Sequence, residues 1–197
     1  MPQLVHTLDS HLDLVHDGVT LFSYVYRPQT PAIESPRPYF HPLRTLKGNV
    51  VSGFRPHDHR WHHGLSMTCA NLSGVNFWGG PTYLRDGGYV QLNNNGEQRQ
   101  VGWGEIPPHI GDSRSHKTKY DESFEVYFDQ VHRWQLDKEN ILMNESRKLI
   151  GVTQLGNFER EREPLLRFPA PRSSVEIVNC VTPNYEFLLE LTIMKST

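Results

Sequence analysis

The sequence predicts an all-β protein, an antiparallel β-sandwich or open barrel with little helix. Short strand-forming runs alternate with turn dipeptides such as Asp17-Gly18 and Asn95-Gly96. Residues 124–129 alternate apolar and polar side chains, which is the period of a half-buried strand. No segment shows a capped apolar stripe at helical spacing. A chain of 197 residues can bury one sizeable core, so we expect a single β domain over residues 1–197.

The first half of the chain predicts a hairpin followed by a long irregular connection. Residues 12–15 and 19–26 are strand formers joined through Asp17-Gly18, a turn typical of two-residue hairpins. Residues 27–42 contain five prolines, which lack amide donors, so this stretch should run over the surface or along a sheet edge. A turn is expected at residues 47–49.

The second half predicts further strands separated by turns. From residue 75 to 103 the pattern indicates a meander, and residues 104–119 look irregular. The alternating charges of residues 159–163 are typical of a solvated loop. Later strands are expected at residues 124–128, 131–136, 141–150, 174–181 and 185–194.

Composition restricts the function classes. The net charge of −2 and the absence of Lys or Arg runs give little support to nucleic-acid binding. No apolar run approaches the length of a membrane span, and the N-terminus lacks a signal-peptide pattern. Cys69 and Cys180 have no metal-type spacing, which favours free thiols and a cytoplasmic location.

The most informative segment is residues 55–65, which hold four of the eleven histidines together with Asp58, two arginines and Trp61. Such a group of imidazoles indicates proton transfer, metal binding or capture of a polar ligand. A strand would place His57, His59, Trp61 and His63 on one face, whereas a helix would stack His59 over His62 and His63. Pro56 and Gly64 bracket the segment, which favours an extended stretch or a tight loop.

Four motifs, at residues 35–42, 57–65, 76–80 and 91–96, resemble the bacterial family labelled methane oxygenase PmoA-like, essentially a domain of unknown function. The downstream Trp134 and Glu145-Ser146-Arg147 resemble that family's paired strands. The resemblance covers roughly residues 1–150. It implies that His59 and His62, together with Asp58 and Trp78, matter more than His57 and His63.

The same resemblance implies a galactose-mutarotase-like sandwich and a chain shorter than other family members. Residues 151–197 would then be divergent or truncated, leaving an open sheet edge that favours self-association. The methane-oxygenase label itself implies a membrane enzyme, which the absence of an apolar span contradicts.

Two chemistries compete for the histidine segment. A metal interpretation uses one divalent ion on His57, His59 and His63, or on His59, His62 and Asp58, with a carboxylate such as Glu105 or Glu145. His109 and His116 are candidates for a distant ligand. Cupin-like barrels bind a metal through a His-x-His pair of this kind. The glutamate shortly after the pair and the second histidine motif that complete the cupin pattern are not present in this sequence.

A sugar interpretation assigns His59, His62 and Asp58 to proton transfer. Trp103 and Trp134 are expected in the core. For Trp61 and Trp78, a place in the wall of the site and a place in the core are equally expected. The predicted substrate-binding residues are Arg55, His57, His63, Trp61, Asn76, Trp78 and His41. The leading hypothesis is an epimerase- or lyase-like reaction on a carbohydrate or polyol, with metal assistance as one option. The alternative is a non-catalytic carbohydrate-binding or accessory module, and the sequence leaves open whether the protein is an enzyme.

Overall fold

A computed structural model describes residues 2–45, 47–105, 107–112, 124–153, 174–182 and 185–195. Apart from the short 3-10 helix η1 (Ala32–Glu34), the regular elements in these ranges are β-strands, and their pairings are antiparallel. The prediction of an all-β antiparallel protein with little helix is therefore confirmed.

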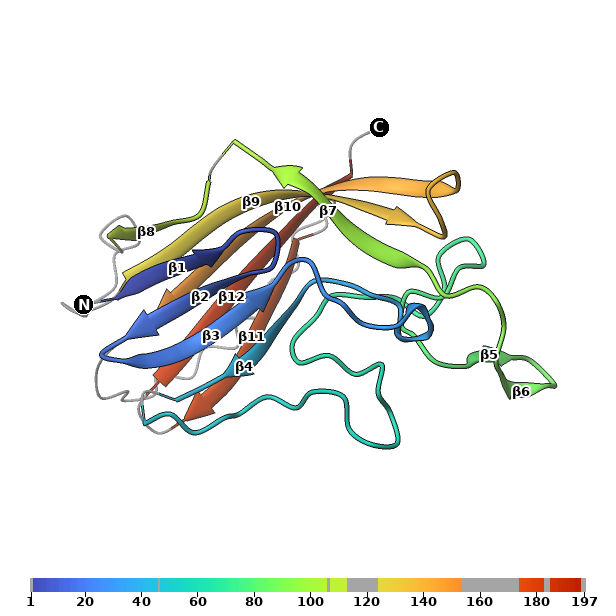
Figure 1. Ribbon diagram of the computed structural model, residues 1–197, viewed down its shortest axis with the longest axis horizontal. Coiled ribbons are helices and arrows are strands. Elements are labelled where there is room, and N and C mark those ends of the chain that lie inside the picture. The colour runs from blue at the N-terminus through green and yellow to red at the C-terminus, as the bar shows by residue number, and fades with distance from the viewer. Residues whose placement is uncertain are drawn as a thin grey trace. The chain divides into compact units, whose positions relative to one another are not determined.

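The first sheet has the order β1-β2-β3-β4, formed by β1 (Gln3–Thr7), β2 (His11–His16), β3 (Val19–Val25) and β4 (Tyr39–Leu43). Figure 1 shows these four strands side by side. The predicted hairpin is present: His16 pairs with Val19 across a turn in which Asp17 and Gly18 both have positive φ. Alternation along β2 buries Leu12 and Leu14.

The proline-rich stretch leads into the edge of this sheet, as its missing donors predict. It contributes η1 and then β4, which is the end strand of the sheet next to β3 and also forms an isolated bridge from Phe40 to Leu65. The loop before β4 nevertheless buries three polar residues, Glu34, Ser35 and Arg37.

The second large sheet has the order β11-β12-β10-β9-β7, with β8 paired to β9. Its strands are β7 (Glu97–Trp103), β8 (His109–Asp112), β9 (Phe124–Gln135), β10 (Ile141–Thr153), β11 (Ser174–Thr182) and β12 (Tyr185–Lys195). Strand β12 pairs on one side with β10 and on the other with β11, so the predicted strand at residues 185–194 is internal to the sheet. The described residues thus form one four-stranded and one six-stranded sheet, which agrees with the predicted sandwich class.

The predicted meander is wrong in one respect, because the strand that follows the turn at residues 86–88 does not join the sheet of β7. The short strands β5 (Thr82–Leu84) and β6 (Gly88–Val90) pair with each other in a separate two-stranded hairpin. Residues 75–78 make only isolated bridges. In Figure 1 the segment from β4 to β5, coloured cyan to green, runs as loops and ends in the projecting β5–β6 hairpin.

The chain forms two compact units. The first comprises mainly residues 3–101 and 132–144, and the second residues 102–131 and 145–197. Within the first unit, Val75, Phe77 and Trp134 form a buried cluster, with the rings of Phe77 and Trp134 edge to face at 4.9 Å. Trp134 is thus a core residue, as expected. Within the second unit, Arg147 donates two hydrogen bonds to Glu145 at 2.7 and 2.8 Å, and both side chains are buried.

Some expectations fall outside the described residues, namely His116, the charged run at residues 159–163 and most of the loop before residue 119. Among the residues that the structure describes, no helix is long and apolar enough to cross a membrane.

Candidate functional site

The histidine segment folds as a tight loop and not as a strand. The amide of His59 donates to the carbonyl of Pro56 at 3.1 Å, and the amide of His62 donates to the carbonyl of His59 at 3.0 Å. The amide of Arg55 donates to the carbonyl of His62 at 2.8 Å and closes the loop. These turns bring His59 and His62 to the same side, where their rings stack with centroids 5.3 Å apart.

Two tryptophans join the two histidines in what we call the ring cluster, formed by His59, Trp61, His62 and Trp78. The ring of His62 lies edge to face with Trp78 at 5.4 Å and with Trp61 at 6.2 Å. Trp61 is also 5.2 Å from His59. Trp78 is 42% exposed, so its indole is open to contact with a ligand.

Asp58 lies at the edge of the ring cluster. Its Oδ2 is 2.9 Å from Nδ1 of His59, and the hydrogen bond from His59 holds the pKa of Asp58 below its ordinary value. Partial burial, helped by the neighbouring His59 and Arg37, lowers the pKa of His62 against the opposing effect of Asp58. At neutral pH, His62 is therefore an uncharged imidazole that can accept a proton.

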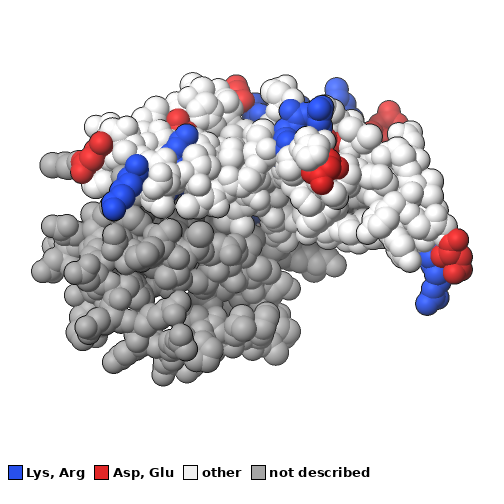
Figure 2. Space-filling view, turned by 90° about the horizontal axis from the view of Figure 1, so that it is seen from below, with Lys and Arg blue, Asp and Glu red and all other residues white. Residues whose placement is uncertain are grey.

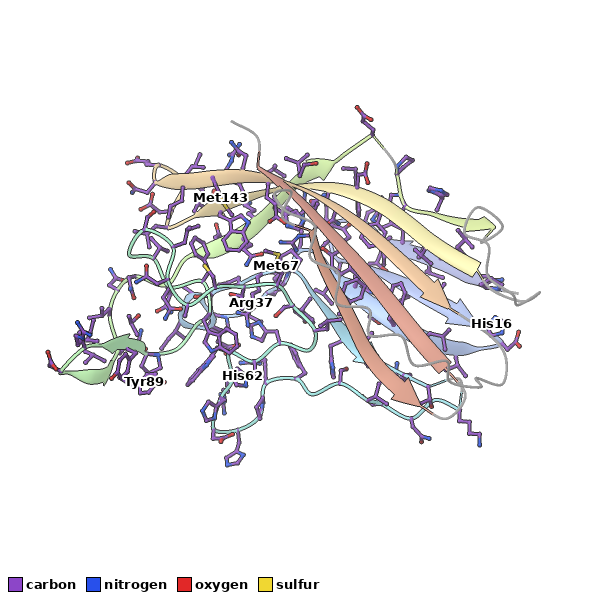
Figure 3. The ribbon with its side chains drawn as sticks, turned by 180° about the vertical axis from the view of Figure 1, so that it is seen from behind. His16, Arg37, His62, Met67, Tyr89 and Met143 are labelled. Atoms are coloured by element: carbon purple, nitrogen blue, oxygen red, sulfur yellow. The ribbon has the colours of Figure 1, made fainter. Side chains whose placement is uncertain are left out.

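A single buried arginine fixes the backbone beneath both tryptophans. Nη2 of Arg37 donates to the carbonyl of Trp61 at 2.7 Å, and Nη1 donates to the carbonyl of Trp78 at 3.0 Å. Further bonds reach the carbonyls of Glu34 and Ser35 and the hydroxyl of Ser66. Burial lowers the pKa of Arg37 to about 10, so the guanidinium stays charged at neutral pH. Figure 3 shows Arg37 among the loops of the first unit and His62 on the loop that extends beyond it.

The Trp78 loop has a shape that only glycine permits next to Trp61. Gly79 and Gly80 both have positive φ, and a Cβ on Gly80 would lie 2.6 Å from the indole of Trp61. Asn76 holds this loop: its Oδ1 accepts from the amides of Trp78 and Gly79, and its Nδ2 donates to the carbonyl of Gly80.

A buried ionic group lies next to the histidine loop. Arg55 donates to both carboxylate oxygens of Glu34, at 2.9 and 2.7 Å, and Nε2 of His63 donates to Glu34 at 2.9 Å. Burial acts to raise the pKa of Glu34, but these hydrogen bonds outweigh it, and the pKa lies below its ordinary value. Burial lowers the pKa of His63 more than Glu34 raises it. The side chains of Arg55 and His63, both predicted to bind substrate, are thus bonded to Glu34.

The predicted metal set of His57, His59 and His63 is not assembled. His63 is buried against Glu34, whereas the side chain of His57 is 96% exposed. No group of three or more His, Cys, Asp or Glu side chains within the described ranges could hold a metal ion. The physical reason is the turn: on a strand these three rings would share a face, but the tight loop separates them.

Two of the more distant metal-ligand candidates are engaged elsewhere. Glu145 accepts from Arg147, and Nδ1 of His109 donates to the carbonyl of Pro107. His41, predicted to bind substrate, shares a hydrogen bond with Ser52 at 2.8 Å and stacks on Phe54. It makes no ring contact with the ring cluster among the described residues.

Sequence reasoning missed Glu34 and Arg37. The available signal was two opposite charges inside a proline-rich stretch with almost no other charge.

On the face drawn in Figure 2, the charged side chains of the described residues are intermixed in sign and leave broad uncharged areas between them. Of the predicted site residues, the structure brings His59, Trp61, His62 and Trp78 together in the ring cluster, with Asp58 at its edge and Asn76 bonded to the backbone of Trp78.

Comparison with known proteins identifies the family. Residues 11–155 match DUF6807, a family of unknown function, and the chain belongs to that family. This corrects the expected PmoA-like identity, because nothing in the match carries a methane-oxygenase label. No curated protein matches the chain. No solved structure matches it either.

Proposed function

Because the chain belongs to a family without a known function, we propose its function from the site alone: it binds a carbohydrate through the ring cluster. The observation that carries the proposal is the exposed indole of Trp78, set edge to face against His62 on a backbone fixed by Arg37. Sugar-binding sites combine an aromatic surface, which packs on the apolar face of a sugar ring, with polar groups that bond its hydroxyls.

The polar groups of the cluster suit a neutral polyol. His62 is uncharged at neutral pH, and the Asp58–His59 pair offers an acceptor and a donor next to it. A rigid backbone lowers the entropic cost of binding, because the rings do not have to be ordered by the ligand. The proposal therefore favours the binding-module alternative over the enzyme hypothesis.

One observation supports a second candidate function, in which the site also transfers a proton on the carbohydrate that it binds. His62 has a lowered pKa and stacks on His59, which in turn bonds Asp58. This is the arrangement of a base with a neighbouring imidazole held by a carboxylate. In this reaction His62 would take the proton from the carbon next to the carbonyl of a neutral sugar, leaving an enediolate. Reprotonation of that carbon from solvent on the opposite face would give the epimer, and loss of the β-oxygen substituent, protonated by solvent as it leaves, would give elimination.

Trp78→Ala tests the proposal directly. We expect the native protein to bind members of an immobilised panel of neutral and acidic sugars, and Trp78→Ala to weaken that binding by roughly tenfold or more. Leu8→Ala is the matched control, because Leu8 is also an exposed apolar side chain but lies in the turn between β1 and β2. Equal binding by both variants, or no binding by the native protein, would contradict the proposal.

His62→Gln separates the two candidates. Glutamine keeps hydrogen-bonding capacity but cannot accept a proton in this pH range, so a pure binding site retains most of its affinity. A catalytic site would keep binding while losing solvent-deuterium exchange into the bound sugar, measured by NMR. Exchange that persists in His62→Gln would exclude His62 as the base.

A further inference from the structure

The hairpin β5–β6 carries a second exposed aromatic pair. Tyr83 and Tyr89 are directly opposite each other in the register, with ring centroids 5.4 Å apart, and they are 65% and 77% exposed. Two-stranded hairpins have little stability by themselves in water, and a cross-strand aromatic pair adds to it. The ring surfaces that the two tyrosines do not turn toward each other stay open to solvent and to a ligand.

The orientation of the hairpin places these tyrosines toward solvent. Thr82 precedes Tyr83 and bonds Asn76 and Asn94 through its hydroxyl, so the Thr82 side of the hairpin faces the protein. Side chains alternate along a strand, and Tyr83 and Tyr89 therefore lie on the opposite side. Asn76, which holds the Trp78 loop, thus also holds the base of the hairpin.

The segment that carries Trp78 and the hairpin is nearly uncharged. From Gly64 to Gly96 the only charged residues are Arg85 and Asp86, both in the turn of the hairpin. Polar side chains here are amides and hydroxyls, among them Gln91 and Asn95, which bond each other at 3.0 Å. This segment presents hydrogen-bonding groups and few charges, which favours a neutral, hydroxyl-rich ligand. The carboxylate of Asp58, at the edge of the ring cluster, is a further acceptor for its hydroxyl groups.

We propose that the hairpin extends the ring cluster into a binding surface for a neutral oligosaccharide, with Tyr83 and Tyr89 contacting sugar units beyond the one at Trp78. This inference rests on the proposed function and names its ligand class more closely. The chain between Trp78 and Tyr83 limits the distance of their Cα atoms to at most about 18 Å, a separation that an oligosaccharide can bridge. Figure 3 shows Tyr89 on the projecting hairpin and His62 on the histidine loop, both toward the lower side of that view.

The test is calorimetry with malto-, cello-, xylo- and manno-oligosaccharides, each from monosaccharide to hexasaccharide. For the series that binds, affinity should rise with chain length, and the double variant Tyr83→Ala/Tyr89→Ala should lose that rise, by roughly fivefold to thirtyfold for the hexasaccharide. Its affinity for the monosaccharide should stay as in the native protein. The double variant Tyr83→Phe/Tyr89→Phe keeps the rings and should keep most of the affinity, which controls for a misfolded hairpin. Affinity should also be nearly independent of salt.

Different failures have different meanings. Binding that Trp78→Ala abolishes, but that does not rise with chain length or respond to the tyrosine variants, overturns the extended surface and leaves the proposed function standing. No binding of any sugar by the native protein overturns both. Tyrosine variants that change the sedimentation of the protein and not its sugar affinity would make the hairpin a self-association surface, which also overturns the inference.

Discussion

At the scale of single residues, Arg37 connects the most distant parts of the candidate site. Its donors satisfy carbonyl groups on η1, on the histidine loop and on the Trp78 loop, while Glu34 supplies a nearby opposite charge. A buried cation with this many partners is strongly destabilising to remove, because several carbonyls lose their donors at once.

We therefore expect Arg37→Met to lower the free energy of unfolding by about 3–5 kcal/mol. Arg37→Lys keeps the charge but cannot reproduce the planar fork of donors, so it should fall between Arg37→Met and the native protein. Chemical denaturation measures both. The control is Arg99→Met, on an exposed arginine of β7, which should change stability by no more than about 0.5 kcal/mol. Equal stability of the two methionine variants would show that Arg37 is not needed.

At the scale of elements, the histidine loop and the Trp78 loop depend on each other. Trp61 can lie against the Trp78 loop only because Gly79 and Gly80 have no side chain. The sequence pair Gly79-Gly80 indicates a turn, and the structure adds a packing reason for it.

Gly80→Ala should therefore cost more than backbone strain. Its positive φ alone disfavours alanine by about 1–2 kcal/mol, and the new Cβ would also meet the indole of Trp61. Gly74→Ala is a close control, since Gly74 has a positive φ of 85° but nothing within 4 Å of an added Cβ. We expect both variants to be less stable in denaturation, and only Gly80→Ala to change tryptophan fluorescence and sugar binding. A fluorescence spectrum of Gly80→Ala that equals that of Gly74→Ala would refute the contact.

At the scale of the whole molecule, His62, the buried His63 and the buried Glu34 contribute to the pH dependence of stability. Burial lowers the pKa of His62 and His63 below the ordinary value of 6.5. The unfolded chain then takes up protons at a higher pH than the folded chain, so stability falls as pH falls from above 6.5 toward the lower folded values. Glu34 has a pKa below its ordinary 4.5, and its contribution is present above that value and is lost as pH falls through the folded pKa.

Urea denaturation between pH 8 and pH 3 should accordingly show two successive losses of stability, the first below pH 6.5 and the second below pH 4.5. His63→Gln should reduce the first loss. His57→Gln should leave it unchanged, because the His57 side chain is almost fully exposed. A first loss of equal size in all three proteins would show that His63 does not contribute.

The sequence by itself determined the features that depend on neighbouring residues. Asp17-Gly18 requires positive φ at both positions, so the β2–β3 hairpin and its turn followed from two residue types. Alternation at residues 124–129 predicted the first part of β9, which continues through the stretch expected as a separate strand at residues 131–136. The prolines of residues 27–42 predicted a surface or edge course for the segment that ends in β4 at the end of its sheet. These local rules were enough for the all-β antiparallel class.

Only the tertiary structure decided how the site is built. Arg37 bonds Trp78 across 41 positions of sequence and Trp61 across 24, and no local pattern specifies such pairs. The sequence located the histidine segment and favoured an extended stretch or a tight loop over a helix, but it left those two open. The choice of the tight loop separates His57 and His63 from His59 and His62. The physical reason is that burial and partners fix the role of a polar side chain, and both are supplied by residues distant in the chain.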